Sequence, residues 1–390
     1  MTILTISLFS FLLLIASVCL SFCNCNSNVL CIESERDALL KFKIDLIDPS
    51  NSLSSWVEGG DCCDWNGVVC HNSTAHVTQL LLAPPDGRQG YGRSALGGKI
   101  NPSLLELQHL NWLDLSNNNF STIQIPKFLG LLGSLTYLNL SQARFQGAIP
   151  RNLGNLSELQ YLDLGRNYFS KVKSLQWISG LSSLQYLDLS GVHLRKATDW
   201  LQVTLSNLPS LLELRLSDCS LEGPIPDYFG NMSFLEVVDF SSNSLNSSIP
   251  NSLYSLNHLR SLTLSFNDLQ GEISSAIGNL SSLIHLDLSF NELQGKVPDS
   301  LGDLCKLKEM DLSSNGIDQD ISQILLILST CCLDCLVSLR MSYNQLSGHL
   351  TDQLGQFKIL AYMDLARNNI SGPIPWSIGE LSFLKVFDVS

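Results

Sequence analysis

Leucine recurs along this chain with a fixed spacing, L-x-x-L-x-L-x-x-N, in which the x positions vary and are mostly polar. Copies of the phrase begin at Val77, Leu110, Leu135, Leu159, Leu184, Leu211, Leu235, Leu259, Leu283, Leu307, Leu336, Leu360 and Leu384. Most successive copies are 24 or 25 residues apart. A fixed period of this length predicts a solenoid, which is a stack of similar coils.

Within each copy, the alternating leucines predict a short strand with one buried face. A coil that buries about six apolar side chains gains roughly 2 kcal/mol from each. Ordering its backbone costs about 1–2 kcal/mol per residue. A single coil therefore cannot fold alone, so neighbouring coils must share a core and pair their strands as one parallel sheet.

The asparagine that closes the phrase has a predicted structural role. Its amide can bond the backbone groups that the strand ladder leaves unpaired in the following turn. Ala143, Val192 and Cys219 replace it in three coils. We expect looser turns at Ala143 and Val192, and we expect the repeat to tolerate Cys219.

The second half of many coils reads G-x-I-P-x-x-L-G-x-L or a close variant, with examples that start at Gly147, Gly223, Gly295 and Gly372. Proline fixes an extended segment and glycine permits close turns. Residues 31–390 thereby resemble the plant-specific leucine-rich repeats of cell-surface receptors and secreted inhibitors. The resemblance implies an α/β solenoid, a right-handed superhelix with a parallel sheet on its concave face and 3-10 or extended segments on its convex face.

Two segments carry a closer resemblance. Residues 191–203, G-V-H-L-R-K-A-T-D-W-L-Q-V, and residues 31–36, C-I-E-S-E-R, look like receptor-like proteins related to ethylene-inducing-xylanase receptors. Members of that family lack a kinase and sense microbial elicitors in plant immunity. The resemblance implies an extracellular protein or peptide ligand, a partner kinase for signalling, and a place on the plasma membrane at full length or in the apoplast otherwise.

The predicted organisation has three parts. Residues 1–23 resemble a secretory signal, because Leu8–Leu20 is an apolar run of suitable length. Residues 24–76 form a cysteine-bearing cap, and residues 77–390 form the repeats. The last phrase stops before its asparagine, so we expect the chain to be the N-terminal portion of a longer protein.

Twelve cysteines in an exported chain imply disulfide bonds. The resemblance implies the pairs Cys31–Cys62 and Cys63–Cys70 in the cap. Residues 33–43 read as a helix whose apolar face, Ala38, Leu39 and Phe42, would cover the first coil.

One coil is enlarged by a segment with apolar residues at helical spacing, Ile321, Ile324, Leu325 and Leu328, which predicts a helix on the convex side. Cys305 and Cys332 each precede a phrase in adjacent coils. We therefore favour a Cys305–Cys332 bond, although Cys331 or Cys335 are also suitable partners.

Polar signals add to this picture. Sequons for N-glycosylation occur at Asn72, Asn119, Asn139, Asn155, Asn231, Asn246, Asn279 and Asn369. The net charge of −13 arises largely from an aspartate that follows the middle strand leucine in many coils. Such a charge argues against a nucleic-acid surface.

The predicted binding surface is the concave face, which carries the strand positions that are not leucine. Four aromatic residues at equivalent positions would stack there, and aromatic side chains are enriched in binding hot spots. The candidate ligand-binding residues are Trp112, Tyr137, Tyr161, Arg166, Tyr186, Arg215, His285, Arg340, Tyr362 and Arg367, with Phe266, Phe290 and Tyr343 nearby. The alternative is that the aromatic residues only stabilise the sheet by cross-strand stacking.

Catalytic patterns are missing from the sequence. Neither H-E-x-x-H nor G-x-S-x-G occurs, the C-x-x-C at Cys332–Cys335 stands alone, and the aspartates are spread over an open sheet. We therefore predict a non-enzymatic protein without a metal or cofactor. The alternative functions are a secreted protein similar to polygalacturonase inhibitors, and a structural scaffold or decoy.

Overall fold

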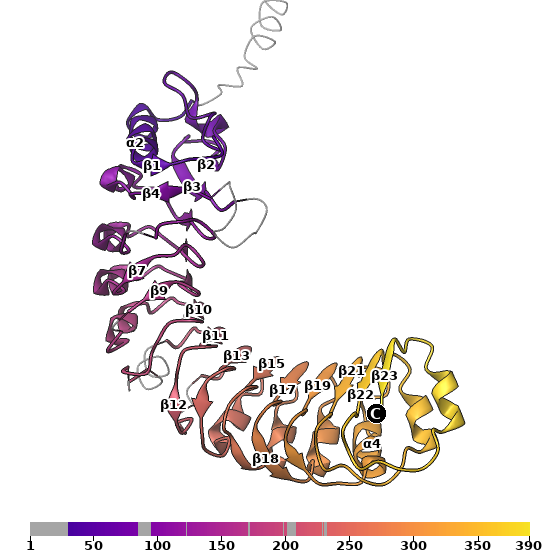
Figure 1. Cartoon of the computed structure of the whole chain (residues 1–390). Helices are drawn as coiled ribbons and strands as arrows, with labels where there is room; N and C mark the ends of the chain where they lie inside the picture. The colour runs from indigo at the N-terminus through magenta and orange to yellow at the C-terminus, as the bar shows by residue number, and fades with distance from the viewer. Residues whose placement is uncertain are drawn as a thin grey trace, which may run out of the picture.

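The computed structural model describes residues 30–84, 95–121, 123–170, 172–197, 199–200, 208–227, 229 and 232–390. Figure 1 shows a stack of coils that bends into an arc, with short strands along its inner face and helical turns along its outer face. The predicted solenoid is confirmed. The predicted signal segment, residues 1–23, lies outside the described residues.

The inner face is one sheet of fourteen strands within the described ranges. In spatial order they are β2 (Val68–Cys70), β3 (Val77–Leu81), β5 (Trp112–Asp114), β6 (Tyr137–Asn139), β8 (Tyr161–Asp163), β10 (Tyr186–Asp188), β11 (Glu213–Arg215), β13 (Val237–Asp239), β15 (Ser261–Thr263), β17 (His285–Asp287), β19 (Glu309–Asp311), β21 (Ser338–Arg340), β22 (Tyr362–Asp364) and β23 (Val386–Asp388). β2 and β3 are antiparallel, and the later neighbours are parallel. The register sets the buried middle residue of each strand beside that of the next, as with Leu138 and Leu162.

The outer face consists mainly of short 3-10 helices. They are η2 (Pro102–Glu106), η3 (Lys127–Leu131), η4 (Arg151–Asn155), η5 (Gln176–Gly180), η7 (Asn251–Ser255), η8 (Ser275–Asn279), η9 (Asp299–Asp303), η10 (Asp352–Gln356) and η11 (Trp376–Glu380), while η1 (Cys62–Asp64) belongs to the cap. In the enlarged coil, α4 (Ile321–Ser329) takes the equivalent place between η9 and η10. Ile321, Ile324, Leu325 and Leu328 are buried, so the predicted helix is confirmed.

Small sheets connect the two faces along the flank. β1 (Leu46–Ile47) pairs antiparallel with β4 (Gly97–Gly98). The other pairs are parallel: β7 (Gln146–Gly147) pairs with β9 (Tyr168–Phe169), and β12 (Glu222–Gly223) pairs with β14 (Ser244–Leu245). β18 (Glu292–Gly295) lies between β16 (Gln270–Glu272) and β20 (Gly316–Ile317) and is parallel to both. These strands extend the contact between coils beyond the main sheet.

A single hydrophobic core runs from the cap to the last coils. Leucines at equivalent positions of successive coils, such as Leu162, Leu187 and Leu214, are completely buried. Each contributes roughly 2 kcal/mol only because the neighbouring coils shield it from water. The stable unit is therefore a group of adjacent coils.

The closing asparagines connect adjacent coils. Asn167 donates from Nδ2 to the carbonyl oxygen of Leu164 in its own coil (2.9 Å) and to that of Leu140 in the preceding coil (2.8 Å). Its Oδ1 accepts from the backbone nitrogen of Phe145 (3.0 Å). The same arrangement recurs at Asn118, Asn243, Asn267, Asn291, Asn315, Asn344 and Asn368. The predicted backbone bonds are confirmed, and the structure adds that two of these three bonds cross between coils.

The coils in which Ala143, Val192 or Cys219 replaces the asparagine differ from one another. The Cys219 thiol donates to the carbonyl oxygen of Leu189 in the preceding coil (3.2 Å), so it retains one of the connecting bonds. This explains how the repeat accommodates cysteine. Ala143 and Val192 are fully buried, and the looser turns expected there stay a prediction.

The N-terminal cap closes the first coil as expected. α2 (Glu33–Ile44) buries Ala38, Leu39 and Phe42, and the disulfides Cys31–Cys62 and Cys63–Cys70 are both present. The buried Glu35 accepts a hydrogen bond from the backbone nitrogen of Val77 (2.7 Å), and its other oxygen lies 2.8 Å from His76 Nδ1. These contacts anchor the cap to β3.

The third disulfide corrects the prediction from the sequence. Cys305 is bonded to Cys331, not to Cys332, with 5.0 Å between the Cα atoms. Cys305 lies on the exposed surface after η9, and Cys331 follows the end of α4 on that same side. Cys332 is completely buried, and its thiol lies 3.4 Å from the carbonyl oxygen of Leu304.

The connecting bonds lead to a prediction about stability. Asn167→Ala should lower the free energy of unfolding by about 3 kcal/mol, because two buried carbonyls and a backbone nitrogen would lose their partner. The measurement is denaturant unfolding followed by circular dichroism. The exposed Asn257→Ala is the matched control and should change stability by less than about 0.5 kcal/mol. Equal unfolding midpoints for the two variants would contradict the role assigned to Asn167.

Candidate functional site on the concave face

Four aromatic side chains form a continuous stack across β5, β6, β8 and β10. We call it the aromatic column, and its members are Trp112, Tyr137, Tyr161 and Tyr186, which occupy one register position. Successive ring centroids are 3.5, 4.2 and 4.1 Å apart, with interplanar angles of 7°, 13° and 9°. All four residues are partly exposed, so the stacking predicted from the sequence is confirmed.

A cation extends the aromatic column by one strand. The Arg215 guanidinium carbon lies 6.0 Å from the centroid of the Tyr186 ring, and one of its nitrogens lies 3.0 Å from Glu213 Oε2. This distance is within the range of a cation–π contact. Burial, followed by the charge of Asp188, raises the pKa of Tyr186 to about 12, and burial raises the pKa of Tyr161 further. The phenols therefore stay neutral and can both donate and accept hydrogen bonds.

A small polar pocket of about 280 Å³ adjoins the aromatic column. Its lining includes Asp163, Asp188, Arg166 and Arg215. The lack of a side chain at Gly165 leaves room in this pocket, because a Cβ at this position would lie 3.2 Å from both Asp163 Oδ1 and Asp188 Oδ1. Burial, together with the charge of Asp188, raises the pKa of Asp163 to about 6. The concave face thus combines aromatic surface with a charge that titrates near neutral pH.

The aspartates along the sheet have a structural role that the sequence analysis missed. Asp163 Oδ1 accepts from the backbone nitrogen of Gly165 (2.8 Å), and Asp188 Oδ1 accepts from that of Ser190 (2.7 Å). Asp114, Asp239, Asp287, Asp311, Asp364 and Asp388 accept equivalent bonds two residues on. The recurring D-x-S spacing could have indicated this, because aspartate often bonds its own backbone at that separation.

The remaining predicted residues do not join the aromatic column. His285 lies four strands beyond Tyr186, about 19 Å at the usual strand spacing, and its Nδ1 is 3.3 Å from Glu309. Arg340 Nη1 lies 3.9 Å from Asp311 Oδ2, and the Lys385 ammonium lies 5.9 Å from the centroid of the Tyr362 ring. Among these predicted residues, Arg215 contacts the aromatic column, and Arg166 lines the adjoining pocket with it.

A rim of residues with left-handed backbone borders the concave face. Arg166 and Arg367 have φ of 54° and 57°, and both are exposed. Phe266 and Phe290 have φ of 55° and 53°, are 53% and 47% exposed, and stack with centroids 4.2 Å apart. This second aromatic pair lies on later coils than the aromatic column.

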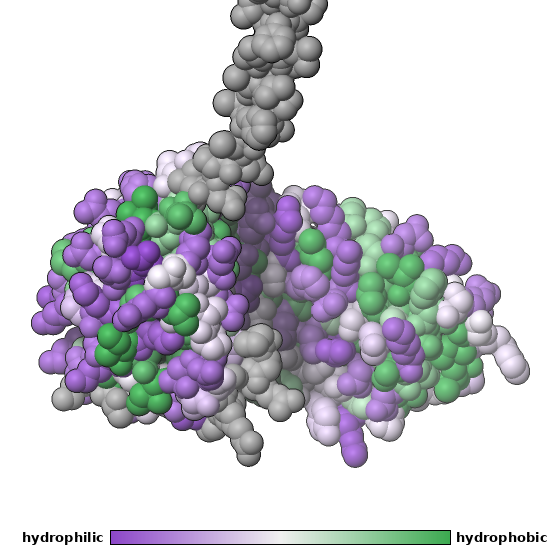
Figure 2. All heavy atoms as spheres, turned by 90° about the horizontal axis from the view of Figure 1, so that it is seen from above, coloured by the Kyte–Doolittle hydropathy of each residue, from purple (hydrophilic) through white to green (hydrophobic). Residues whose placement is uncertain are grey.

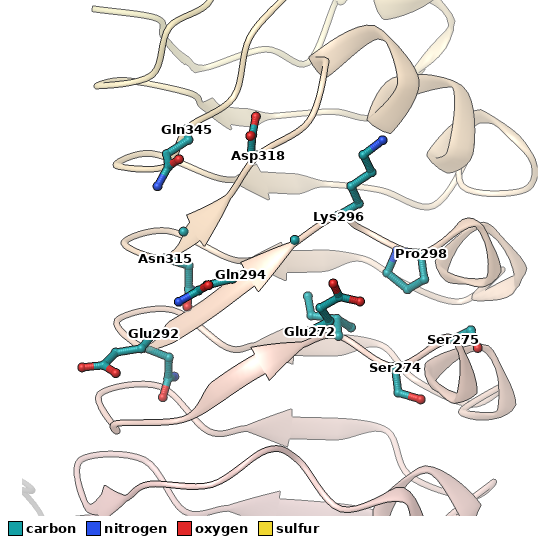
Figure 3. Close-up of a pocket in the computed structure, with 14 residues that line it drawn as sticks. Glu272, Ser274, Ser275, Glu292, Gln294, Lys296, Pro298, Asn315, Asp318 and Gln345 are labelled. Carbon is teal, nitrogen blue, oxygen red and sulfur yellow. The ribbon is translucent and has the colours of Figure 1, made fainter.

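An open groove of about 1080 Å³ lies on the flank, over β16, β18 and β20. Figure 3 shows carboxylates and amides along it, including Glu272, Glu292, Gln294 and Asp318, with Lys296 beside them. Gln270, next to the groove, donates a hydrogen bond from Nε2 to Glu292 Oε2 (2.9 Å). This groove could not be predicted from the sequence, because its residues come from four coils and form no motif along the chain.

The sequons occupy different surroundings. Those at Asn72, Asn155, Asn246, Asn279 and Asn369 are exposed, those at Asn119 and Asn139 are partly buried, and Asn231 lies outside the described residues. Asn139 belongs to β6 beside the aromatic column, and its Oδ1 accepts from the backbone nitrogen of Ser141 (3.0 Å). Glycosylation at all eight positions stays a prediction.

Two further features bear on the chemistry of the chain. In the part that the structure describes, the one cluster of three side chains able to ligate a metal is Cys31, Cys62 and Cys63, and all three are in disulfides. Among the same residues, no helix combines the length and apolar character needed to cross a membrane. Figure 2 shows hydrophilic and hydrophobic residues interspersed over the visible surface.

Comparisons with known sequences identify the repeats. Residues 32–71 match the leucine rich repeat N-terminal domain. Residues 133–194, 209–269 and 274–317 match the leucine rich repeat, and residues 109–132 and 360–381 match a second description of it. A segment of 126 residues is 48% identical to receptor-like protein EIX2 of Solanum lycopersicum, over 32% of this chain and 12% of that protein. The aligned part is thus a small fraction of that relative.

Solved structures share the fold over most of the chain. The ectodomain of the membrane receptor kinase GASSHO1/SCHENGEN3 from Arabidopsis thaliana, in complex with CASPARIAN STRIP INTEGRITY FACTOR 2, has a TM-score of 0.72 and 30% identity over 91% of this chain and 44% of its own. The Arabidopsis receptor kinase HAESA, in complex with the peptide hormone IDA and the co-receptor SERK1, has a TM-score of 0.74 and 27% identity over 87% and 54%.

The raised pKa of Asp163 leads to a prediction about pH. Between the ordinary aspartate pKa and about pH 6, Asp163 is protonated in the folded chain and ionised in the unfolded chain. The free energy of unfolding therefore falls as the pH rises through this range to 6. Asp163→Asn should therefore stabilise the fold at pH 7 by about 2 kcal/mol after allowance for solvent screening, and by progressively less toward pH 4. The measurement is denaturant unfolding of both proteins from pH 4 to 8.

The asparagine variant is suitable because the chain already has one at the equivalent position. Asn139 accepts from the backbone nitrogen of Ser141 just as Asp163 accepts from that of Gly165. The substitution should therefore retain the turn and remove only the charge. A stability difference that does not change between pH 4 and 8 would refute the assignment to Asp163.

Proposed function

Because this chain belongs to the leucine-rich repeat family, with repeats over more than half of its length, we propose that it is the non-catalytic recognition part of a plant cell-surface immune receptor. It binds an extracellular protein or peptide through its concave face. The aromatic column is the observation that supports this proposal most directly. Four rings form one partly exposed surface there, with Arg215 at its end.

The physical argument for this surface concerns contact area and entropy. Aromatic rings offer a large contact area and lose few rotamers on binding. Stacking fixes the rings before a ligand arrives, so binding costs less conformational entropy. The neighbouring polar pocket adds hydrogen-bonding and charged groups that can fix the orientation of a ligand.

Fold requirements alone do not explain an aromatic residue at this register position. The same position carries Ser261 on β15 and Ser338 on β21, and those strands pair with their neighbours in the same way. The sheet therefore forms with small polar residues there. A four-ring stack is more than the sheet requires.

The proposed kind of ligand and the proposed signalling partner rest on similarity to known proteins and not on the geometry of the concave face. The family resemblance of residues 31–36 and 191–203 favours a receptor that lacks its own kinase and senses a microbial elicitor, and the similarity to a receptor-like protein over 126 residues agrees with that family. The HAESA structure contains a peptide hormone and a co-receptor, and the GASSHO1/SCHENGEN3 ectodomain contains CASPARIAN STRIP INTEGRITY FACTOR 2. We propose that this chain likewise acts through an adaptor or co-receptor kinase. Its place would be the outer side of the plasma membrane, reached through the secretory pathway.

A binding experiment tests the proposed surface. The glycosylated chain is first screened against proteins secreted into the apoplast by plant-pathogenic microbes, and the dissociation constant of a captured protein is then measured. Replacing Tyr137, Tyr161 and Tyr186 together by alanine should weaken binding at least 100-fold, because several hot-spot residues of about 1–2 kcal/mol each would be lost. Thermal unfolding should show that the variant still folds.

The second aromatic pair provides the matched control. Phe266→Ala with Phe290→Ala also removes stacked, exposed rings from the same arc, and it should leave the affinity within about threefold. Unchanged affinity in the folded triple variant would show that the aromatic column is not the binding surface. A larger loss in the Phe266 and Phe290 variant would move the site to the rim.

A further inference from the structure

The turn after α4 contains three cysteines, and only one of them is bonded. Cys331 forms the disulfide with Cys305, whereas Cys332 and Cys335 carry free thiols. The segment therefore reads C-C-x-x-C with one bridge made and two thiols unused. These two thiols are close in sequence, so their separation in space decides whether they can bond.

The backbone between Cys332 and Cys335 forms a closed turn. The backbone nitrogen of Cys335 donates to the carbonyl oxygen of Cys332 at 3.3 Å, and that of Leu336 donates to the same oxygen at 3.0 Å. A four-residue turn closed in this way keeps its terminal Cα atoms within about 7 Å. A disulfide requires Cα atoms about 4.4–6.8 Å apart. The turn therefore satisfies the main geometric condition.

The two side chains also lie on one side of the turn. The Cys332 thiol is 3.4 Å from the carbonyl oxygen of Leu304, and the Cys335 thiol is 3.2 Å from that of Leu307. Leu304 ends the preceding coil and Leu307 begins the enlarged coil, so the two acceptors are only three residues apart. Burial, followed by the neighbouring Cys335 thiol, raises the pKa of Cys332 to about 12. The sulfurs thus face the same short segment and influence each other.

We propose that Cys332 and Cys335 are a disulfide site, in which Cys335 reacts first with an external disulfide and Cys332 then completes the bond. The order follows from exposure. Cys332 is completely buried, whereas Cys335 is partly exposed and within reach of a reagent from solvent. Cys219, the other free thiol among the described residues, is buried with no cysteine in its own coil.

The reaction balances with oxidised glutathione, a small disulfide, as the oxidant. The Cys335 thiol loses its proton to water, and its sulfur attacks the disulfide, which releases one glutathione thiolate and leaves a mixed disulfide. The Cys332 thiol then loses its proton, and its sulfur attacks Cys335 Sγ, which releases the second glutathione. Two protein thiols are oxidised, one disulfide is reduced to two thiols, and the two protons are taken up by the released thiolates.

The new bond would stabilise a junction between coils. The turn carries Leu333, whose carbonyl oxygen accepts from the backbone nitrogen of Lys358 in the next coil (3.0 Å). Cys305–Cys331 connects α4 to the preceding coil on the other side. Together the two disulfides would fix both sides of the enlarged coil.

Differential alkylation tests whether the bond exists. The full chain, secreted from eukaryotic cells, is denatured and alkylated without reduction, then reduced and alkylated with a second reagent, and digested with trypsin. Cys331, Cys332 and Cys335 lie in one tryptic peptide, residues 309–340, and Cys305 lies in another, residues 297–306. We expect the second label on all four of these cysteines and the first label on Cys219.

Two outcomes of this mapping would overturn the proposal. The first label on both Cys332 and Cys335 would show that they stay reduced. A Cys305–Cys332 bond with a Cys331–Cys335 bond, found by fragmentation of the unreduced peptides, would show a different pairing.

Single variants test the order of reaction. With oxidised glutathione, Cys332→Ser should retain one glutathione on Cys335, because the attacking thiol is missing. Cys335→Ser is the matched control and should take up at least tenfold less, because the remaining Cys332 thiol is buried. Intact-protein mass spectrometry measures both, and thermal unfolding confirms that both variants fold. Equal uptake by the two variants, or none by Cys332→Ser, would refute the proposed order.

Discussion

Each coil depends on its neighbours because it cannot shield its own leucines. The buried leucines of successive coils form one continuous core, and the closing asparagines bond backbone groups in two coils at once, as Asn167 does. Hydrophobic contact and polar connection therefore repeat with the same period. This coupling leaves the concave strand positions free of any role in the core, so they can carry side chains for recognition.

The sequence was sufficient for features that repeat. The leucine spacing predicted the sheet and its register, and the spacing of Ile321, Ile324, Leu325 and Leu328 predicted α4. The sequence also predicted the aromatic column, because equivalent positions on adjacent parallel strands must lie side by side. The cap disulfides were implied by resemblance to known repeats, and spacing alone would not have paired them.

Features that depend on local direction could not be predicted in the same way. The partner predicted for Cys305, Cys332, was wrong. Cys331 and Cys332 are adjacent in the sequence, and the direction in which the chain leaves α4 decides which of the two side chains is buried. The flank groove combines residues from four coils. The pKa of Asp163 depends on burial by neighbouring side chains and on Asp188, which no local pattern records.

The spacing of the coils sets a scale for whatever lies along the concave face. Strands are about 4.8 Å apart, whereas a peptide in the polyproline II conformation advances about 3.1 Å per residue and has three residues per turn. Three residues of such a peptide match two coils to within a few tenths of an ångström. A linear peptide laid across the strands would therefore meet every second ring with every third side chain, so the spacing of the coils would favour a matching period in such a peptide.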